Sequence, residues 1–139
     1  MTKNLLLIIS FFVFFSCKKP IQKSQIQYLG GYWEIEKVML PDGDEKEYKA
    51  NETIDYFILK GTTGFRKKGL QQIDGTFLSN DVAEAFSVFW KDEICLLNYK
   101  TEFAKWEEEI VILTKEKLVL KNANDIEYHY KRPVLFTKK

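Results

Sequence analysis

The chain has 139 residues, of which 45% are hydrophobic and 29% charged, a balance typical of a globular domain and not of a disordered chain. Its formal net charge of +1 provides no strong field for a polyanion, which argues against a nucleic-acid binder with a basic groove. Aromatic residues make up 15% of the chain. Part of this aromatic excess lies in the first fifteen residues, and the rest is spread over the body. The composition predicts one domain and no nucleic-acid partner.

The N-terminus has the architecture of a secretory signal. Lys3 precedes an apolar run of eleven residues, Leu5 to Phe15, which Ser16 and Cys17 follow. A helix that crosses a bilayer needs about 20 apolar residues, so this run is too short for a permanent span. We therefore expect a signal-peptide helix over residues 1–16. A plain signal peptide cleaved elsewhere and a buried first helix are the alternatives.

The pair Ser16-Cys17 resembles the lipobox of Gram-negative bacterial lipoproteins. The resemblance implies that Cys17 is acylated and that the protein lies in the outer membrane, facing the periplasm. Residues 17–29 are expected to be the acylated cysteine and a linker, because residues 18–29 have little apolar content and no periodicity. Two or three acyl chains make such attachment stable. Lys18, Lys19 and Lys23 are expected to lie against anionic headgroups, the alternative being a solvated tether.

The body from residue 30 to residue 139 reads as a series of strands separated by short turns. The first strand opens at Gly30 and Gly31, carries Trp33 and Ile35 on one face, and ends at the turn Pro41-Asp42-Gly43-Asp44. Further strands are predicted over residues 53–59, 63–67, 72–78, 85–90, 94–99, 103–113, 118–121 and 126–132. This pattern predicts an all-β domain, an antiparallel meander of eight or nine strands closed as a barrel.

Two stretches resemble lipocalins and related calycins, in particular the lipocalin-like lipoproteins of Gram-negative bacteria. They are Leu29-Gly30-Gly31-Tyr32-Trp33-Glu34-Ile35 at the start, and Trp106 to Thr114, Lys117 to Leu120 and Ile126 to Arg132 in the tail. The resemblance implies that Trp33 packs across the barrel floor. It also implies that Arg132 lies across the Trp33 ring in a cation–π contact.

Two functions remain open, because a barrel of eight strands either fills itself with side chains or holds one small ligand. A carrier of a small hydrophobic ligand would line its interior with these candidates: Tyr56, Phe65, Phe77, Phe86, Val88, Trp90, Tyr128 and Tyr130. The same residues would simply form the core of a filled barrel. In that case we expect a protein-interaction module of the inhibitor or immunity type, binding an envelope protein through loops 41–51 and 66–71.

The sequence predicts no catalytic residues, no metal site and no cofactor. With Cys17 acylated, Cys95 is the remaining thiol, and its apolar neighbours suit a buried strand. The single histidine, His129, is far from it in sequence and is expected to be exposed, on the face opposite Tyr128 and Tyr130. Three strand carboxylates, Asp55, Asp74 and Glu108, face either side of the sheet on this pattern, so no acid–base pair is proposed.

Overall fold

The structure is a computed structural model that describes residues 19–48, 54–74, 76–79 and 82–134. The expected signal peptide over residues 1–16 and the acylation site at Cys17 lie outside these residues. Within the described ranges, no helix is both long enough and apolar enough to cross a membrane.

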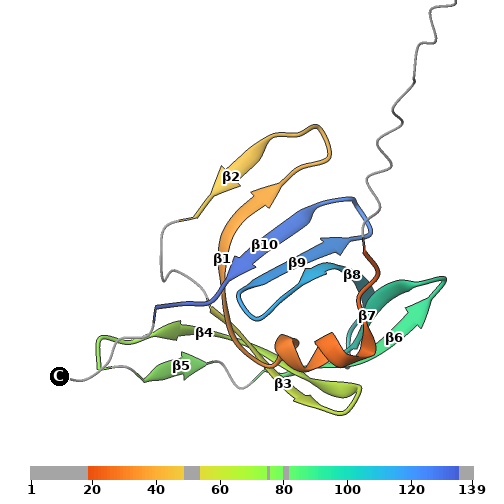
Figure 1. Cartoon of the computed structure of the whole chain (residues 1–139). Helices are drawn as coiled ribbons and strands as arrows, with labels where there is room; N and C mark the ends of the chain where they lie inside the picture. Colours follow the sequence, from red (N-terminus) through yellow and green to blue (C-terminus); the bar gives the residue numbers. More distant parts are fainter. Residues whose placement is uncertain (1–18, 49–53, 75, 80–81, 135–139) are drawn as a thin grey trace, which may run out of the picture.

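Eight antiparallel strands form a closed barrel (Figure 1). In sheet order they are β10 (Glu127–Lys131), β9 (Lys117–Asn122), β8 (Lys105–Leu113), β7 (Ile94–Lys100), β6 (Glu84–Lys91), β4 (Thr63–Gln71), β3 (Ile54–Lys60) and β1 (Gly31–Met39). Pairing of β1 with β10 closes the ring, so neither strand is left with a free edge along the barrel. The predicted antiparallel meander barrel is confirmed.

Two short strands extend the barrel at one end. β2 (Glu45–Glu47) pairs with the last residues of β1, beyond the point where β1 pairs with β3. β5 (Phe77–Ser79) pairs with the last residues of β4, beyond its pairing with β6. Because β1 and β4 are each antiparallel to β3, they run in the same direction, and both hairpins rise from the same end. We call this the open end; the turns β1–β2, β4–β5, β7–β8 and β9–β10 lie there.

Two predicted boundaries around β4 were wrong. Residues 66–71 were expected as a loop but continue β4. Of the strand expected over residues 72–78, residues 73–74 form a turn and the short β5 begins only at Phe77. The backbone passes very close to β5 at Gly69, where a Cβ would lie only 2.8 Å from the carbonyl oxygen of Leu78. Glycine there permits this close pairing instead of breaking the strand.

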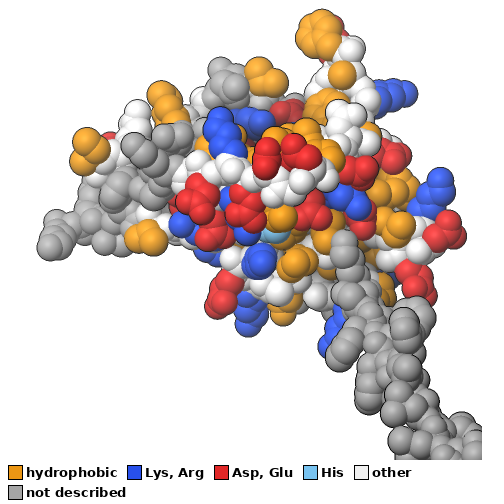
Figure 2. Space-filling model, turned by 90° about the horizontal axis from the view of Figure 1, so that it is seen from above, with side chains coloured by type: hydrophobic (Ala, Val, Ile, Leu, Met, Phe, Trp, Pro, Cys, Tyr) orange, Lys and Arg blue, Asp and Glu red, His pale blue; other side chains and the backbone are white. Residues whose placement is uncertain are grey.

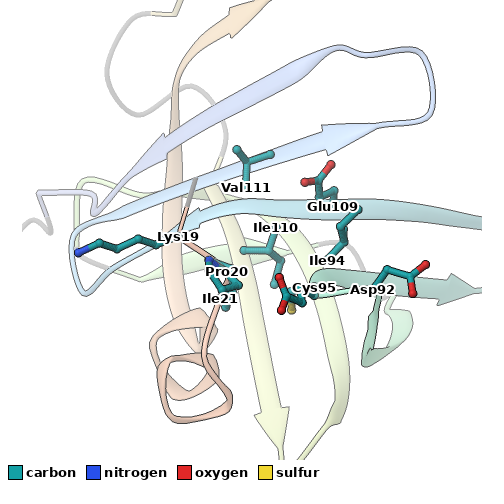
Figure 3. Close-up of a pocket in the computed structure, with 10 residues that line it drawn as sticks. Lys19, Pro20, Ile21, Asp92, Ile94, Cys95, Glu109, Ile110 and Val111 are labelled. Carbon is teal, nitrogen blue, oxygen red and sulfur yellow. The ribbon is translucent and has the colours of Figure 1, made fainter. Parts of the chain in front are cut away.

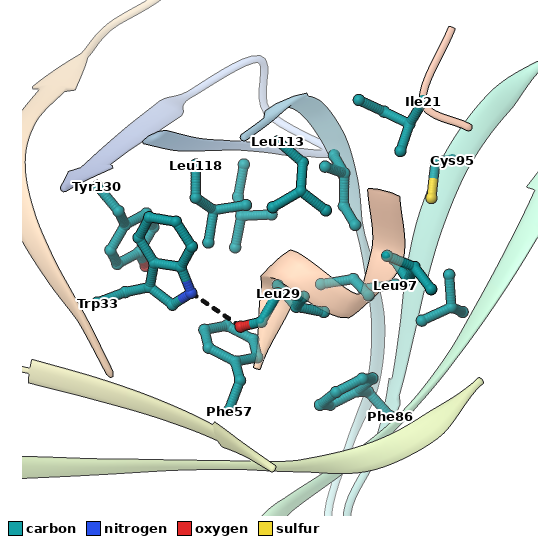
Figure 4. Packing of buried hydrophobic residues seen from close by; sticks show 14 of the residues in the cluster. Ile21, Leu29, Trp33, Phe57, Phe86, Cys95, Leu97, Leu113, Leu118 and Tyr130 are labelled. Atoms are coloured by element: carbon teal, nitrogen blue, oxygen red, sulfur yellow. Dashed lines mark hydrogen bonds between the residues drawn. The ribbon is translucent and has the colours of Figure 1, made fainter. Parts of the chain in front are cut away.

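The opposite end is closed by the 3-10 helix η1 (Lys23–Leu29). Ile21, Ile26 and Leu29 are buried against the barrel core, and the indole Nε1 of Trp33 donates a 2.8 Å hydrogen bond to the Leu29 carbonyl (Figure 4). Residues 21–29, expected as part of a linker, are therefore part of the folded domain. The apolar residues of this short segment supply a plug where the strands alone would leave the barrel open. We call this the closed end.

Apolar side chains fill the barrel from the closed end to its middle (Figure 4). The largest fully buried ones are Trp33, Tyr99, Phe57, Leu29, Leu97, Ile110, Leu113, Leu118 and Leu120. The pairing of β8 with β9 shifts between Ile110 and Ile112. This irregularity turns Leu113 inward, so the expected alternation of β8 holds only as far as Ile110.

Candidate functional site

A cavity of about 220 Å³ lies inside the open end, beyond the packed core. Its wall combines ionisable and aromatic side chains from β4, β8 and β10: Arg66, Lys68, Trp106, Glu108, Tyr128 and Tyr130. Each side chain reaches the interior because alternate residues of a strand face the same side of the sheet. We call this the mouth cavity.

A buried arginine forms the floor of the mouth cavity. Arg66, 7% exposed, donates hydrogen bonds of 3.0 Å to Glu108 on β8 and 2.6 Å to Glu84 on β6. Its guanidinium carbon also lies 4.5 Å from the centre of the Tyr99 ring. Burial of a charge is costly unless it is paired and hydrogen-bonded. Arg66 therefore ties three strands of the barrel together through one charged centre.

A second buried pair joins β10 to β3. The Tyr130 hydroxyl donates a 3.0 Å hydrogen bond to Oδ2 of Asp55. Among the described residues, Oδ1 of Asp55 and Nε of Arg66 have no hydrogen-bond partner. Buried polar atoms in native proteins are nearly always satisfied by protein or by water. The interior of the open half thus retains hydrogen-bonding capacity for a water or a ligand.

Burial sets the protonation behaviour of this cluster. It raises the pKa of both Asp55 and Glu108, against the opposing attraction of Arg66. It also raises the pKa of Tyr99 and Tyr130 well above the ordinary tyrosine value. For Arg66, burial would lower the pKa, but the facing carboxyl groups of Glu108 and Asp55 outweigh this effect and hold the pKa above the ordinary arginine value. The cluster therefore offers a permanent cation, neutral phenols and carboxyl groups that take up protons more readily than usual.

Five of the eight predicted lining residues face the interior, and two of them reach the mouth cavity. Tyr128 is half-buried and Tyr130 is buried, and both line the cavity. Phe86 and Val88 belong to the packed core. Trp90, at the closed end, donates a 2.9 Å hydrogen bond from Nε1 to the Ile21 carbonyl.

The other three predicted lining residues, Tyr56, Phe65 and Phe77, do not line the interior, and these predictions were wrong. Asp55 and Phe57 point inward, which turns Tyr56 outward, and inward Arg66 likewise leaves Phe65 48% exposed. On the outer face, Tyr32 stacks on both Tyr56 and Phe77, with ring centroids 4.3 Å and 4.1 Å apart.

Sequence reasoning missed Arg66, Lys68 and Trp106 as wall residues of a site. For Arg66 and Lys68 the available signal was their spacing of two within a continuous strand, which was concealed because residues 66–71 were expected to form a loop. Glu108 and Asp55 were considered as strand carboxylates, and the structure turns both inward. Asp74 lies exposed in the turn between β4 and β5.

Trp33 and Arg132 lie together at the closed end, away from the mouth cavity. Trp33 is fully buried, and the Arg132 guanidinium lies over its ring. Arg132 also donates hydrogen bonds to the carbonyls of Tyr28, Gly30, Tyr32 and Lys115. The pair closes the barrel and contributes nothing to the wall of the cavity.

Neither Cys95 nor His129 forms a reactive site. Cys95 lies at the base of a hollow of about 260 Å³, where the segment from Lys19 to Ile21 crosses β7 and β8 (Figure 3). Burial raises the pKa of its thiol to about 12, which suppresses the nucleophilic thiolate. His129 is on the outer face, as expected, but it is buried and not exposed, with Nε2 3.0 Å from Glu127. No group of three or more potential metal ligands occurs in the part of the chain that the structure describes.

Comparison with known proteins adds little to this description. No protein-family model matches the chain, and no curated protein matches it. One solved structure, a lipocalin-like protein from Bacteroides uniformis, aligns with a TM-score of 0.48 and 11% sequence identity, over 76% of this chain and 98% of that one. The barrel assignment rests on the strand pairing itself.

Proposed function

We propose that the protein is a lipid-anchored barrel of the bacterial envelope that binds a small ligand in the mouth cavity. The observation that carries this proposal is the buried Arg66–Glu108 pair, which lies in the wall of a cavity at the open end. In a filled barrel, a hydrophobic pair of similar volume would stabilise the fold about as well as a buried ion pair does. A ligand whose polar group binds these charged side chains would explain why the barrel contains the ion pair. The protein is proposed as a binding protein and not as an enzyme.

The size of the cavity favours a compact ligand. Drug-sized ligands occupy pockets of about 300–1,000 Å³, whereas the mouth cavity measures about 220 Å³ and the barrel below it is filled. A long acyl chain does not fit this space. The hydrophobic ligand expected from the sequence is thereby narrowed to a small molecule, with a planar apolar part against Trp106 and Tyr128 and a polar group toward Arg66, Lys68 and Glu108.

The anchor is proposed from the sequence over residues 5–17. Acylation of Cys17 would place the protein in the outer membrane, facing the periplasm. The mass of the N-terminal peptide from envelope fractions tests this step, with acylated Cys17 as the expected species. The Cys17→Ser chain should leave the membrane fraction. If the unchanged chain carries no lipid, the anchor is wrong, whereas the binding proposal is unaffected.

Binding is tested by native mass spectrometry of the Cys17→Ser chain, purified gently from its own host. We expect a retained small-molecule adduct. Two half-buried tyrosines on opposite faces of the sheet provide a matched comparison, since Tyr128 lines the mouth cavity and Tyr56 lies on the outer face. Tyr128→Ala should lose the adduct and Tyr56→Ala should keep it. An adduct that survives Tyr128→Ala, or no adduct after incubation with small-molecule extract of the host, would contradict the proposal.

A second candidate, a protein-interaction module, is favoured by exposed apolar side chains on β3, β4 and β5. Ile58 and Phe65 are cross-strand neighbours on the outer face, 40% and 48% exposed. Leu70 and Leu78 are another cross-strand pair, 50% and 60% exposed, on the face of β4 that also carries Arg66 and Lys68. Neighbouring exposed apolar residues often mark protein contacts. Cross-linking in the intact envelope tests this candidate, which predicts a protein adduct that Phe65→Ser removes and Tyr128→Ala retains.

A further inference from the structure

Basic residues gather at the closed end of the barrel. The residues considered are those of the N-terminal segment, η1, the turns of that end with the strand residues that bound them, and the last residue of β10 with Arg132, which follows it. Eight are basic and three are acidic. The basic ones are Lys19, Lys23, Lys60, Lys91, Lys115, Lys117, Lys131 and Arg132, and the acidic ones are Asp92, Glu93 and Glu116.

The open end has the opposite charge. The same selection of turns and bounding residues among the described residues gives nine acidic and two basic side chains. The acidic ones are Asp42, Asp44, Glu45, Glu47, Asp74, Glu84, Glu102, Asp125 and Glu127, and the basic ones are Lys100 and Lys105. Figure 2 shows acidic side chains, interspersed with basic ones, on the face of the molecule that is uppermost in Figure 1. The near-neutral chain is therefore polarised along the barrel axis.

The N-terminal segment fixes which end lies near Cys17. The Ile21 carbonyl accepts the hydrogen bond from Trp90, and the Ile21 side chain is only 8% exposed, so the chain is held to the closed end at this residue. Four residues lead from Cys17 to Ile21. At about 3.6 Å per residue they span at most about 14 Å. An acyl chain on Cys17 therefore keeps the closed end within about 14 Å of the bilayer surface.

We propose that the closed end docks on an anionic phospholipid surface, so that the mouth cavity points away from the membrane. This inference rests on the lipid anchor of the proposed function. Charge complementarity favours it, because a lysine near an anionic surface adds favourable binding energy and the acidic open end is repelled. Lys19, Lys23 and Lys60 form no salt bridge with any described residue, so their charges are available to headgroups.

Docking in this orientation determines whether the ligand enters the mouth cavity from the aqueous compartment or from the bilayer. The mouth cavity, with Trp106 and Tyr128 in its wall, opens toward the aqueous compartment and not toward the bilayer that holds the anchor. The ligand is thus taken up from solution or from a partner facing the open end. Extraction of a lipid from the anchoring leaflet is excluded by this geometry.

Paramagnetic broadening measures the orientation directly. The isotope-labelled chain, carrying its own anchor, is placed in nanodiscs of phosphatidylcholine and phosphatidylglycerol that contain a nitroxide-labelled lipid. We expect the amide signals of Asp92 and Lys115, in turns of the closed end, to broaden severely. The signals of Glu102 and Asp125, in turns of the open end, should stay sharp. Equal broadening at both ends, or stronger broadening at the open end, would overturn the proposal.

A second measurement separates the docking from the anchor. The Cys17→Ser chain is added to phosphatidylglycerol vesicles, where binding depends on the basic end alone. Lys19→Ser and Lys23→Ser should each weaken binding by about fivefold, whereas Lys100→Ser and Lys105→Ser at the open end should not weaken it. If Cys17 is not acylated, the anchor is refuted, but the vesicle-binding result is unaffected because it is measured with the Cys17→Ser chain. Binding that is indifferent to Lys19 and Lys23 refutes the docking even where the anchor is present.

Discussion

The guanidinium carbon of Arg132 lies 3.6 Å from the centre of the Trp33 indole ring, so the residue that follows the last strand covers the first strand of the barrel. Arg132 also reaches carbonyl oxygens in η1, at the start of β1 and in the turn between β8 and β9. Gly31, with φ of +107°, leaves room for this side chain, because a Cβ there would lie 3.1 Å from Nη1. One side chain thus joins the parts that close the barrel.

Arg132→Met should lower the free energy of unfolding by roughly 2–4 kcal/mol, because it removes the cation–π contact and several charge-assisted hydrogen bonds. Arg132→Lys should recover little of this loss, since an ammonium group cannot reach the four carbonyls that the guanidinium fork reaches. Urea unfolding followed by tryptophan fluorescence measures both changes. The neighbouring exposed Lys131→Met is the control and should change stability little. Equal losses for Arg132→Met and Lys131→Met would contradict the account.

Two glycines of one hairpin should respond very differently to alanine. At Gly64, an added Cβ would collide with the carbonyl oxygen of Ile58 and with the Phe86 ring. Because backbone atoms cannot yield, Gly64→Ala should cost about 3 kcal/mol or prevent folding. At Gly61, φ is +64° and no atom lies within 4 Å of the added Cβ, so Gly61→Ala should cost only about 1–2 kcal/mol. Urea midpoints of the two variants test this ranking, and a greater loss at Gly61 would refute it.

The buried carboxyl group of Asp55 should give the barrel an unusual pH dependence. Because burial raises its pKa above the ordinary value of 3.8, the folded state binds the proton more tightly than the unfolded state. Its contribution to stability therefore falls as the pH rises from the ordinary value through the raised pKa. Asp55→Asn keeps an acceptor for Tyr130 and removes the titration. The stability difference between Asp55→Asn and the unchanged chain should favour the variant more at pH 7 than at low pH.

Urea unfolding at several pH values between 4 and 8 checks that prediction. Glu102→Gln is the control, because Glu102 is exposed in the turn between β7 and β8 and lies outside the cluster. A stability difference for Asp55→Asn that shrinks as the pH rises would show that Asp55 is stabilised as an anion in the fold. That result would contradict the dominance of burial over the attraction of Arg66.

Cys95 should be inert in the folded protein. It is 1% exposed and burial raises its pKa to about 12, so almost no thiolate is present near neutral pH. In the Cys17→Ser chain, Cys95 is the only thiol. A thiol reagent should not modify it at pH 8 in buffer and should modify it fully in urea. Rapid labelling of the folded chain would show that the hollow beside Cys95 opens to solvent.

The local sequence pattern was sufficient to predict the strands of the barrel, but not which side chains face its interior. The alternation in residues 126–132 and 85–90 predicts two strands that the structure contains as β10 and β6. Which face of β3 points into the barrel could not be predicted in this way. Within residues 54–59, one face of the strand carries only apolar or aromatic residues, Tyr56 among them, whereas the other combines Asp55 with apolar residues. The barrel turns Asp55 inward, where Tyr130, 75 residues away in sequence, donates to it. Such a partnership between distant residues leaves no trace in local periodicity.

The three tryptophans allow the central claim, ligand binding in the mouth cavity, to be tested in one experiment. Trp106 lines the mouth cavity, whereas Trp33 and Trp90 lie at the closed end. Fluorine NMR of the 5-fluorotryptophan-labelled Cys17→Ser chain, recorded during addition of small-molecule extract from the host, reports on all three rings at once. Binding in the mouth cavity predicts that the Trp106 resonance moves while those of Trp33 and Trp90 stay in place. A shift of Trp33 or Trp90 without Trp106, or no shift at any ring, would contradict it.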